Sequence, residues 1–332
     1  MVLDLNKCLG CQTCTIACKK LWNTDEGTDY SYWNSVETLP GRGFPAGVHD
    51  PATGGRTVEG GVRRGVVPNL DTAYGRAWTF NHEEARASAG APDKIWIRPR
   101  ETVKWGPNFD EDQGQGDYPK DNHYFYLPRL CNHCTHPACV DACPRAAIAK
   151  RREDGIVLVD QDRCHGYRFC VEACPYKKVY YDHVRQVSTK CIFCLPRIEE
   201  GVAPACARQC PGRLRFVGYR DDEQGPIWKL VEKWKVAIPL HPEYGLGPNV
   251  FYVPPMSPPK LDAEGRPTGE PRIPVSYLES LFGAAVHPAL EALLAERARR
   301  RRGEASELMD LLIAYDWQQN FRLPPRQREV LG

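Results

Sequence analysis

Apolar and polar residues alternate in short runs through the middle of the chain. Residues 148–150 and 156–160 are β-prone runs on either side of a turn signal at 153–155, so they predict a β-hairpin. Residues 179–182 and 185–188 predict a second hairpin in the same way. This region is therefore expected to contain two small antiparallel ribbons.

Two further strands are predicted near the two ends of the cysteine-rich part. Residues 2–5 precede Cys8 in the same way that residues 157–159 precede Cys164, which gives an internal repeat of a strand followed by a cysteine loop. Residues 214–219 predict a strand after Cys210.

From Pro226 onward the pattern changes. Residues 239–259 are rich in proline and predict an extended segment that wraps over a surface. Apolar residues then follow helical spacing and predict amphipathic helices whose apolar stripes serve as docking or core faces. These stripes consist of Leu278, Leu281, Phe282 and Ala285, then Leu290, Leu293 and Leu294, and finally Leu308, Leu311, Leu312 and Tyr315.

Residues 23–120 show little periodicity apart from a short helical run near residues 83–89. They are rich in Gly, Pro, Trp and Tyr, and predict an irregular insertion that covers the rest of the protein and contacts a partner. Gly41, Gly43 and Gly47 do not form the G-x-G-x-x-G pattern of a nucleotide loop.

The composition is typical of a soluble globular protein. The chain has 332 residues, which suggests about two domains, and 42% of them are hydrophobic and 26% charged. The net charge of +2 does not indicate binding to nucleic acid or to an anionic membrane surface. One basic run, Arg297 with residues 299–302, follows a helical segment and is expected to be a solvated helix end.

No stretch of eighteen uncharged apolar residues is present, so no transmembrane segment is predicted. The chain reaches Cys8 with no room for a signal peptide before it. Taken alone, this predicts a cytoplasmic protein, unless a partner carries the export signal for both chains.

The chemistry of the chain lies in its fifteen cysteines, which form four runs. Three runs have four cysteines and end in an x3 step, and two of these are followed by proline. In the fourth run, Tyr167 stands where the second cysteine is expected, and Pro175 follows its last cysteine. The runs are Cys8, Cys11, Cys14 and Cys18; Cys131, Cys134, Cys139 and Cys143; Cys164, Cys170 and Cys174; and Cys191, Cys194, Cys206 and Cys210.

These spacings favour iron–sulfur clusters over the alternatives. Bacterial-type ferredoxins hold two cubanes with such runs, and the fourth cysteine of one run ligates the other cluster. Two pairs of runs therefore imply four clusters, one with an incomplete thiolate set. Structural zinc typically uses two C-x2-C pairs per site. A disulfide framework suits short secreted chains, whereas this chain is long and has an odd number of cysteines.

The runs and their order resemble the iron–sulfur β subunits of the dimethyl sulfoxide reductase superfamily of molybdenum enzymes. The segments DLNKCLGCQTCTIACKKLW, YWNSVET and HPEYGLGPNVFYVPP, together with Tyr167, are similar to the nitrate reductase-like branch. The length is closer to the β subunits of ethylbenzene dehydrogenase, dimethyl sulfide dehydrogenase, and selenate, chlorate and perchlorate reductases than to membrane nitrate reductases.

The fold expected from these features is α+β. It has two bacterial-ferredoxin-like two-cluster units, a long irregular insertion and a C-terminal extended and helical region. The first unit combines residues 1–22 with 176–225, and the second spans 121–175. The insertion covers 23–120, and the C-terminal region covers 226–332.

The resemblance also implies which cysteines hold which cluster, three clusters being [4Fe-4S] and the fourth [3Fe-4S]. In the branch that the chain resembles, a bulky residue at the position of Tyr167 accompanies the [3Fe-4S] cluster. Tyr167 is expected to lie beside cluster 4 without binding it, and the alternative is a [4Fe-4S] cluster with the Tyr167 oxygen as a ligand. The implied sets are Cys8, Cys11, Cys14 and Cys210 for cluster 1 (set 1); Cys18, Cys191, Cys194 and Cys206 for cluster 2 (set 2); Cys131, Cys134, Cys139 and Cys174 for cluster 3 (set 3); and Cys143, Cys164 and Cys170 for cluster 4 (set 4).

The implied function is electron transfer, with no catalytic residues in this chain. The resemblance implies that a molybdopterin-containing catalytic α subunit docks near cluster 1. By the same resemblance, a haem b γ subunit or a cytochrome is expected to exchange electrons near cluster 4. The resemblance also implies a periplasmic location, reached by co-export with the catalytic subunit. The alternatives are a ferredoxin-like subunit of a formate dehydrogenase or hydrogenase, a self-standing enzyme and a zinc scaffold.

Overall fold

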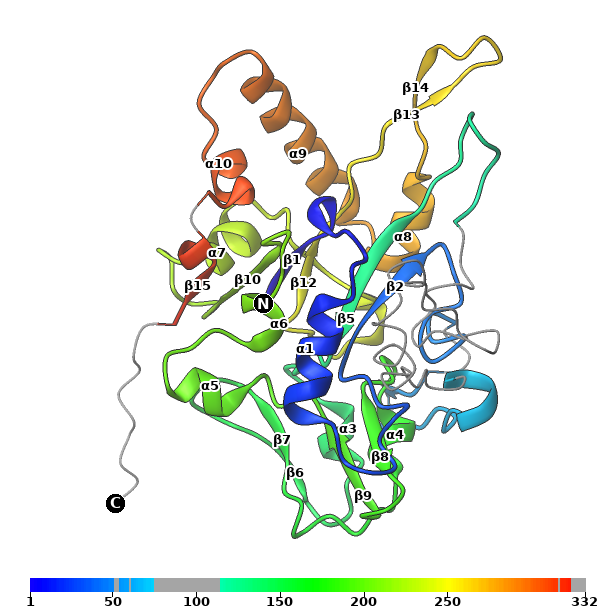
Figure 1. Ribbon diagram of the computed structural model, residues 1–332, viewed down its shortest axis with the longest axis vertical. Helices are drawn as coiled ribbons and strands as arrows, with labels where there is room; N and C mark the ends of the chain where they lie inside the picture. Colours follow the sequence, from blue (N-terminus) through cyan, green and yellow to red (C-terminus); the bar gives the residue numbers. More distant parts are fainter. Residues whose placement is uncertain (51–53, 60, 75–113, 316, 324–332) are drawn as a thin grey trace, which may run out of the picture.

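The computed structural model describes residues 1–332 except 51–53, 60, 75–113, 316 and 324–332. A five-stranded sheet has the order β11–β12–β1–β10–β15 (Figure 1). β1 lies at its centre, parallel to β12 and antiparallel to β10. The strands are β1 (Val2–Asp4), β10 (Arg215–Gly218), β11 (Ile238–Pro239), β12 (Phe251–Val253) and β15 (Phe321–Arg322).

The strands expected at 2–5 and 214–219 are confirmed as β1 and β10. The proline-dense segment differs from expectation in one part. Residues 251–253 do not wrap over a surface but form β12, whose Tyr252 and Val253 are fully buried. These apolar residues interrupt the prolines and pair with the first strand, so they contribute to the core.

The two predicted hairpins are confirmed, with ends that differ by one or two residues. They lie at the lower end of the molecule in Figure 1, beside α3 and α4. Their elements are β6 (Ile148–Lys150), β7 (Val157–Val159), β8 (Val179–Asp182), β9 (Val187–Lys190), α3 (Ala138–Asp141) and α4 (Phe169–Ala173). The short helices α5 (Leu195–Glu199) and α6 (Ala205–Arg208) follow in the chain.

Part of the stretch expected to be irregular is regular. β2 (Asn34–Leu39) pairs antiparallel with β5 (Phe125–Leu130) over six residues. Asn34, Ser35 and Glu37 of this strand are buried polar residues, so the strand lacks the alternation that would have predicted it. A small ribbon, β3 (Arg56–Val58) and β4 (Gly61–Arg63), and the turn of helix η2 (Leu70–Tyr74) lie in the same stretch. The predicted run near residues 83–89 lies outside the described residues.

The predicted C-terminal helices are confirmed as α8 (Val275–Phe282), α9 (Val286–Arg301) and α10 (Glu307–Ile313). Six of the eleven apolar stripe residues are buried, but Ala285, Leu294 and Tyr315 are exposed. Ala285 lies beyond the end of α8, and Tyr315 lies beyond the end of α10. The basic run lies at the end of α9, where Arg299 and Arg302 pair with glutamates, so its interpretation as a solvated helix end is confirmed.

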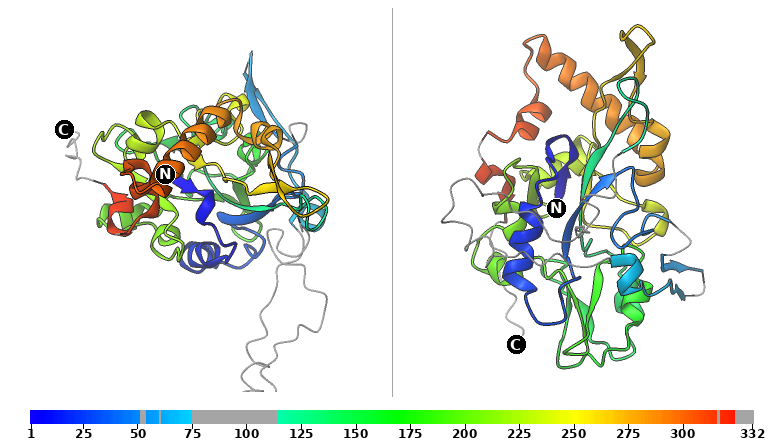
Figure 2. Two further views of the ribbon diagram at one scale, coloured as in Figure 1. Left: turned by 90° about the horizontal axis from the view of Figure 1, so that it is seen from above. Right: turned by 45° about the vertical axis from the view of Figure 1, so that its right-hand side comes forward.

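The remaining helices connect these parts. α1 (Thr13–Trp22) packs against α6, and α7 (Pro226–Trp228) continues into η4 (Lys229–Lys233) and packs on β10. The hairpin of β13 (Pro259–Leu261) and β14 (Pro267–Pro271) projects from the body (Figure 2). Single turns form η1 (Leu5–Lys7), η5 (Pro242–Tyr244) and η6 (Trp317–Asn320).

No helix in the described part of the chain is both long enough and apolar enough to cross a membrane.

Candidate iron–sulfur sites

Set 1 surrounds a cavity where the two ends of the cysteine-rich region meet. Cys8 follows η1, Cys11 and Cys14 lie at the start of α1, and Cys210 follows α6. The pairing of β1 with β10 brings these segments together, so all four thiols line one cavity. Val36 of β2 and Pro128 of β5 line the same cavity.

Set 2 lies between α1 and α6, which pack on each other. Cys18, on α1, is close enough to Cys191, Cys194 and Cys206 for their charges to raise the pKa of its thiol further above the value that burial alone would give. Two groups donate hydrogen bonds to the Cys194 sulfur: the Trp22 indole N–H at 3.1 Å and the Ala205 amide at 3.4 Å.

Set 3 lines a second cavity at the end of β5. Cys131 and Cys134 follow this strand, Cys139 lies on α3, and Cys174 follows α4. Tyr176 and Lys178 line this cavity as well.

Set 4 lines a third cavity with only three thiols, those of Cys143, Cys164 and Cys170. The Ala147 amide donates to the Cys143 sulfur at 3.3 Å. Ser188 contacts both other sulfurs, because its amide donates to Cys164 at 3.3 Å and its Oγ lies 3.3 Å from the Cys170 sulfur.

Tyr167 lies at the rim of the set 4 cavity rather than inside it. The residue is 55% exposed, and its ring centroid is 6.2 Å from the rings of both His165 and Phe169. The tyrosine therefore borders both the cavity and the solvent.

The cavities suit a cluster better than a single ion. Four, three and four thiols line the cavities of sets 3, 4 and 1, respectively, so each space is bordered by sulfur from several directions. In the described part of the chain, no three His, Cys, Asp or Glu side chains converge as ligands of one metal ion. All fifteen cysteines are free thiols, and a donor set of soft sulfurs around a common space fits iron–sulfur chemistry.

Burial disfavours the thiolate form on which such ligation depends. It raises the pKa of Cys8 and Cys206 to about 12 and that of Cys170 to about 11. Iron removes this cost, because coordination deprotonates a thiol outright. Buried positive charges of the chain also favour the thiolate form.

Buried cations lie between consecutive sets. Arg215 is 2% exposed and lines the set 1 cavity. Its charge lowers the pKa of Cys8 of set 1 and of Cys206 of set 2.

Lys178 lies between sets 2 and 3. Burial lowers its pKa to about 7, while Glu37, Cys18 and Cys174 favour its charged form. Sequence analysis missed both cations, although Arg215 lies within the strand predicted at 214–219 and Lys178 immediately precedes the one predicted at 179–182.

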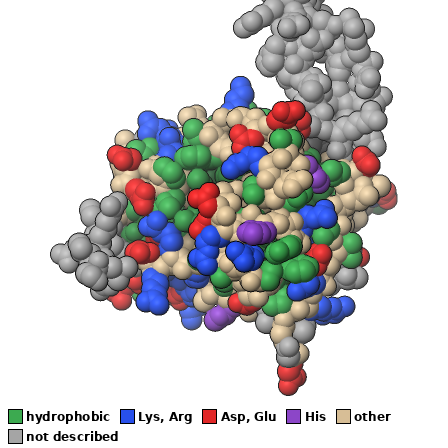
Figure 3. Space-filling model, turned by 90° about the horizontal axis from the view of Figure 1, so that it is seen from below, with side chains coloured by type: hydrophobic (Ala, Val, Ile, Leu, Met, Phe, Trp, Pro, Cys, Tyr) green, Lys and Arg blue, Asp and Glu red, His purple; other side chains and the backbone are tan. Residues whose placement is uncertain are grey.

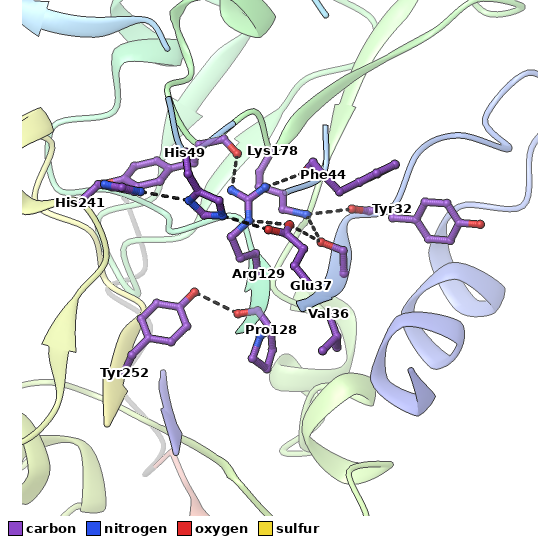
Figure 4. A network of polar contacts seen from close by, with 12 residues as sticks. Tyr32, Val36, Glu37, Phe44, His49, Pro128, Arg129, Lys178, His241 and Tyr252 are labelled. Atoms are coloured by element: carbon purple, nitrogen blue, oxygen red, sulfur yellow. Dashed lines mark hydrogen bonds and ion pairs between the residues drawn. The ribbon is translucent and has the colours of Figure 1, made fainter. Parts of the chain in front are cut away.

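A buried polar network supports the walls of two cavities (Figure 4). The Arg129 Nε donates to Glu37 Oε1 at 2.7 Å, and its Nη1 donates to the Tyr176 carbonyl at 3.0 Å. Arg129 thereby links the β2–β5 pair, which borders set 1, to Tyr176 beside set 3. Burial alone would raise the pKa of Glu37, but Arg129 and His49 lower it to about 2.

His49 continues this network towards the surface. Its Nε2 lies 3.1 Å from Glu37 Oε2, and its Nδ1 lies 3.1 Å from His241 Nε2. His241 in turn contacts the half-exposed Glu243 at 2.8 Å. The partners in this network are up to 192 positions apart, so no local pattern predicted it.

Comparisons with known proteins agree with this chemistry. Residues 122–220 match the family described as 4Fe-4S dicluster domain. The chain is 55% identical to the dimethylsulfide dehydrogenase subunit beta of Rhodovulum sulfidophilum, over 97% of this chain and 98% of that protein. It is 53% identical to the selenate reductase subunit beta of Thauera selenatis, over 95% of each chain. It is 55% identical to the respiratory nitrate reductase subunit beta of Haloferax mediterranei, over 97% of this chain and 92% of that protein.

Proposed function

The chain belongs to the iron–sulfur β subunits of the dimethyl sulfoxide reductase superfamily, in the nitrate reductase-like branch, and from this premise we propose how its thiols are divided among four clusters. It is an electron-transfer subunit of an oxidoreductase complex and contains a 4Fe-4S dicluster domain. In the proposal, sets 1, 2 and 3 each hold a [4Fe-4S] cluster and set 4 holds a [3Fe-4S] cluster.

One observation carries this assignment. Cysteines from distant segments gather so that sets 1, 3 and 4 each line their own cavity, and the thiols of set 2 influence one another between α1 and α6. Each of the fifteen cysteines is used once. When bound, the clusters supply one-electron carriers whose potentials respond to burial, charge and hydrogen bonds to sulfur.

The residues around the sets have defined tasks in this proposal. Arg215 and Lys178 offset the negative charge that thiolates bring into the interior. The amides of Ala147, Ser188 and Ala205 donate to cysteine sulfurs and hold them in place. Tyr167 shields the open side of set 4.

The test of the assignment is the iron content and the EPR spectrum of the purified complex. The air-oxidised protein is expected to show a [3Fe-4S] signal near one spin per chain, together with fifteen iron atoms in this subunit. Tyr167→Cys supplies a fourth thiol to set 4, so it should diminish this signal in favour of a fourth cubane.

Tyr167→Phe is the matched control, because it keeps the ring and adds no ligand. It should leave the [3Fe-4S] signal unchanged. An oxidised wild-type protein without this signal would contradict the proposed cluster 4. Loss of the signal in Tyr167→Phe would instead indicate that the tyrosine oxygen is a ligand.

We place a molybdopterin-containing catalytic subunit at the set 1 side. Cys11 is exposed there, and the neighbouring side chains Leu9, Ile16 and Leu21 are 66, 47 and 46% exposed. Ile16 and Leu21 line an open groove with Cys11. Exposed apolar residues beside an exposed cluster ligand are typical of a permanent subunit interface. In this proposal, a haem b subunit or a cytochrome exchanges electrons at the set 4 side.

Co-export to the periplasm with the catalytic subunit is also part of the proposal, and it rests on the branch that the chain resembles. Expression of the chain without the catalytic subunit should leave it in the cytoplasm, and co-expression should move it to the periplasm. Export of the chain by itself would contradict this location mechanism.

A further inference from the structure

His133 is a buried histidine in the loop between Cys131 and Cys134 of set 3. It is 5% exposed and lines the set 3 cavity. Other histidines reach the surface, as the purple side chains on the face drawn in Figure 3 show, and there water can satisfy both ring nitrogens. The ring of His133 is shielded from bulk water, so each of its nitrogens needs a partner inside the protein.

One of these nitrogens has a partner that fixes where the ring carries its proton. The Val157 amide, at the start of β7, donates to His133 Nδ1 at 2.9 Å. A nitrogen that accepts from an N–H carries no proton itself, so the proton of the ring is on Nε2. The Nε2–H group is therefore a hydrogen-bond donor.

This donor has no acceptor in the described part of the chain, where the buried Nε2 forms no hydrogen bond. Leaving a buried donor unpaired is costly, and native proteins seldom do so. The cavity that His133 lines is the one to which we assign a [4Fe-4S] cluster, and the sulfur atoms of such a cluster accept hydrogen bonds. A cluster in this cavity would thus supply the missing acceptor.

The surroundings hold His133 in this position. Lys150 Nζ and Asn249 Nδ2 both donate to the His133 carbonyl, at 3.1 and 2.9 Å. The Phe193 ring packs edge-on against the imidazole, with 5.3 Å between the ring centroids. Phe193 belongs to the cysteine loop of set 2, so His133 lies on the side of set 3 that faces set 2.

We propose that the Nε2–H of His133 donates a hydrogen bond to a sulfur atom of cluster 3 and thereby raises the reduction potential of this cluster. A donor stabilises the reduced cluster more than the oxidised one, because the reduced cluster carries more negative charge. His133 is then a positioning residue of the electron relay and carries no electron itself. This inference rests on the proposed assignment of a [4Fe-4S] cluster to set 3.

The experiment is a redox titration of the purified complex followed by EPR, which gives the midpoint potential of each cluster. His133→Asn keeps an amide oxygen that can accept from Val157 but places no donor at the position of Nε2. The equilibrium constant for reduction of cluster 3 should fall about fivefold to tenfold, which is roughly 40–60 mV at about 59 mV per tenfold change. The midpoints of the other three clusters should stay unchanged.

Matched variants separate the hydrogen bond from a packing effect. His133→Gln places an amide nitrogen near the position of Nε2 and should restore most of the potential. Trp22→Phe removes the indole donor to the Cys194 sulfur, so it should lower the midpoint of cluster 2 and leave that of cluster 3 unchanged. Together with Trp22→Phe, Cys11→Ser at set 1 and Tyr167→Cys at set 4 show which midpoint belongs to which cluster.

A second measurement does not depend on the folding of His133→Asn. With histidine labelled with ¹⁵N, pulsed EPR of the reduced wild-type complex should detect a ¹⁵N coupling to a [4Fe-4S] cluster, and His133→Gln should lack this coupling. Its absence from the wild-type complex would overturn the proposal.

Three results of the titration would also overturn it. Unchanged midpoints in His133→Asn would indicate that a buried water satisfies Nε2. Equal shifts in His133→Asn and His133→Gln would indicate a packing effect. A shift at a cluster other than cluster 3 would show that the donor serves a different site.

Failure of this inference is distinguishable from failure of the proposed function. Iron content and EPR of the wild-type complex report whether set 3 holds a cluster at all. If all four clusters are present and only the response to His133→Asn is missing, the inference about His133 alone fails. If set 3 holds no cluster, the proposed assignment fails as well.

Discussion

The two ends of the row of thiol sets are built differently. Set 1 has four thiols, a buried arginine beside them and exposed leucine and isoleucine side chains near its mouth. Set 4 has three thiols, and Tyr167, Arg145 and Arg168 line its cavity. Buried Arg215 lies between sets 1 and 2, and buried Lys178 lies between sets 2 and 3. The basic residues at set 4 are on the surface instead.

The two ends of this electron-transfer subunit therefore differ in where their charged side chains lie. At set 1, Arg215 is buried beside the thiols, and the adjoining groove combines exposed Ile16 and Leu21 with Lys20 and Arg197. An apolar core with a polar rim is expected where a partner stays bound. At set 4, Arg145, His165 and Arg168 line the cavity and are exposed to solvent. The following predictions test this contrast, beginning with the largest expected effect.

Cys210→Ser should have the largest effect, because set 1 joins the two ends of the cysteine-rich region. Loss of this ligand should remove cluster 1 and impair folding and assembly. Cys170→Ser removes a ligand of the local set 4 and should affect assembly less. Iron analysis and EPR of both variants measure the difference. Loss of cluster 2 with retention of cluster 1 in Cys210→Ser would show that the division into sets is wrong.

Glu37→Gln tests the network that links the walls of sets 1 and 3. It leaves Arg129 buried without its carboxylate, so the free energy of unfolding should fall by about 3–5 kcal/mol at pH 7. Chemical denaturation of the complex measures this change. Glu264→Gln, an exposed glutamate paired with Arg266, should cost no more than about 1 kcal/mol.

The same variant should change the pH dependence of stability. The pKa of Glu37 is lowered from 4.5 to about 2 in the folded protein, so its stabilisation is fully present above pH 4.5 and is lost as the pH falls towards 2. This corresponds to roughly 3 kcal/mol. Stability of Glu37→Gln should fall less steeply in that range. An unchanged slope would show that Glu37 does not carry a charge in the folded state.

Ile16→Glu tests the apolar surface beside set 1. A charge in an apolar interface should weaken binding of the catalytic subunit by roughly 2 kcal/mol or more, which is at least about thirtyfold in Kd. Co-purification and analytical ultracentrifugation measure the binding. Ile313→Glu places the same charge at an exposed position on α10 and should leave the affinity unchanged. Equal weakening by both variants would place the interface elsewhere.

Ser188→Ala should have the smallest effect and should act only at set 4. It removes the hydroxyl that lies 3.3 Å from the Cys170 sulfur. Loss of one hydrogen bond of about 1 kcal/mol should lower the potential of cluster 4 by roughly 40 mV, because the more negative reduced state is stabilised less. A redox titration followed by EPR measures the shift, and Ser280→Ala on α8 is the control. A shift at the other clusters would contradict this local role.

Sequence reasoning succeeded where a structure is local or where a spacing has chemical meaning. The cysteine steps and the Cys-Pro endings indicated iron–sulfur chemistry, and turn signals predicted both hairpins. Helical spacing predicted α8, α9 and α10 because each has a continuous apolar stripe.

What it missed depends on contacts between distant residues. β2 was hidden because Glu37, Asn34 and Ser35 are buried with partners far away in the sequence. Arg215 and Lys178 could not be distinguished from surface cations, since only the folded chain places them between thiol sets.

The meeting of Cys8 with Cys210 across β1 and β10 has a consequence for synthesis of the chain. A ribosome that has added Cys174 has already completed sets 3 and 4, while set 1 still lacks Cys210 and set 2 has one of its four thiols. The N-terminal cysteines must therefore wait, reduced, until 210 of the 332 residues have been made. In the proposed assignment, pairing of β1 with β10 would thus order metal uptake in time, and the end at which we place the catalytic subunit would be completed last.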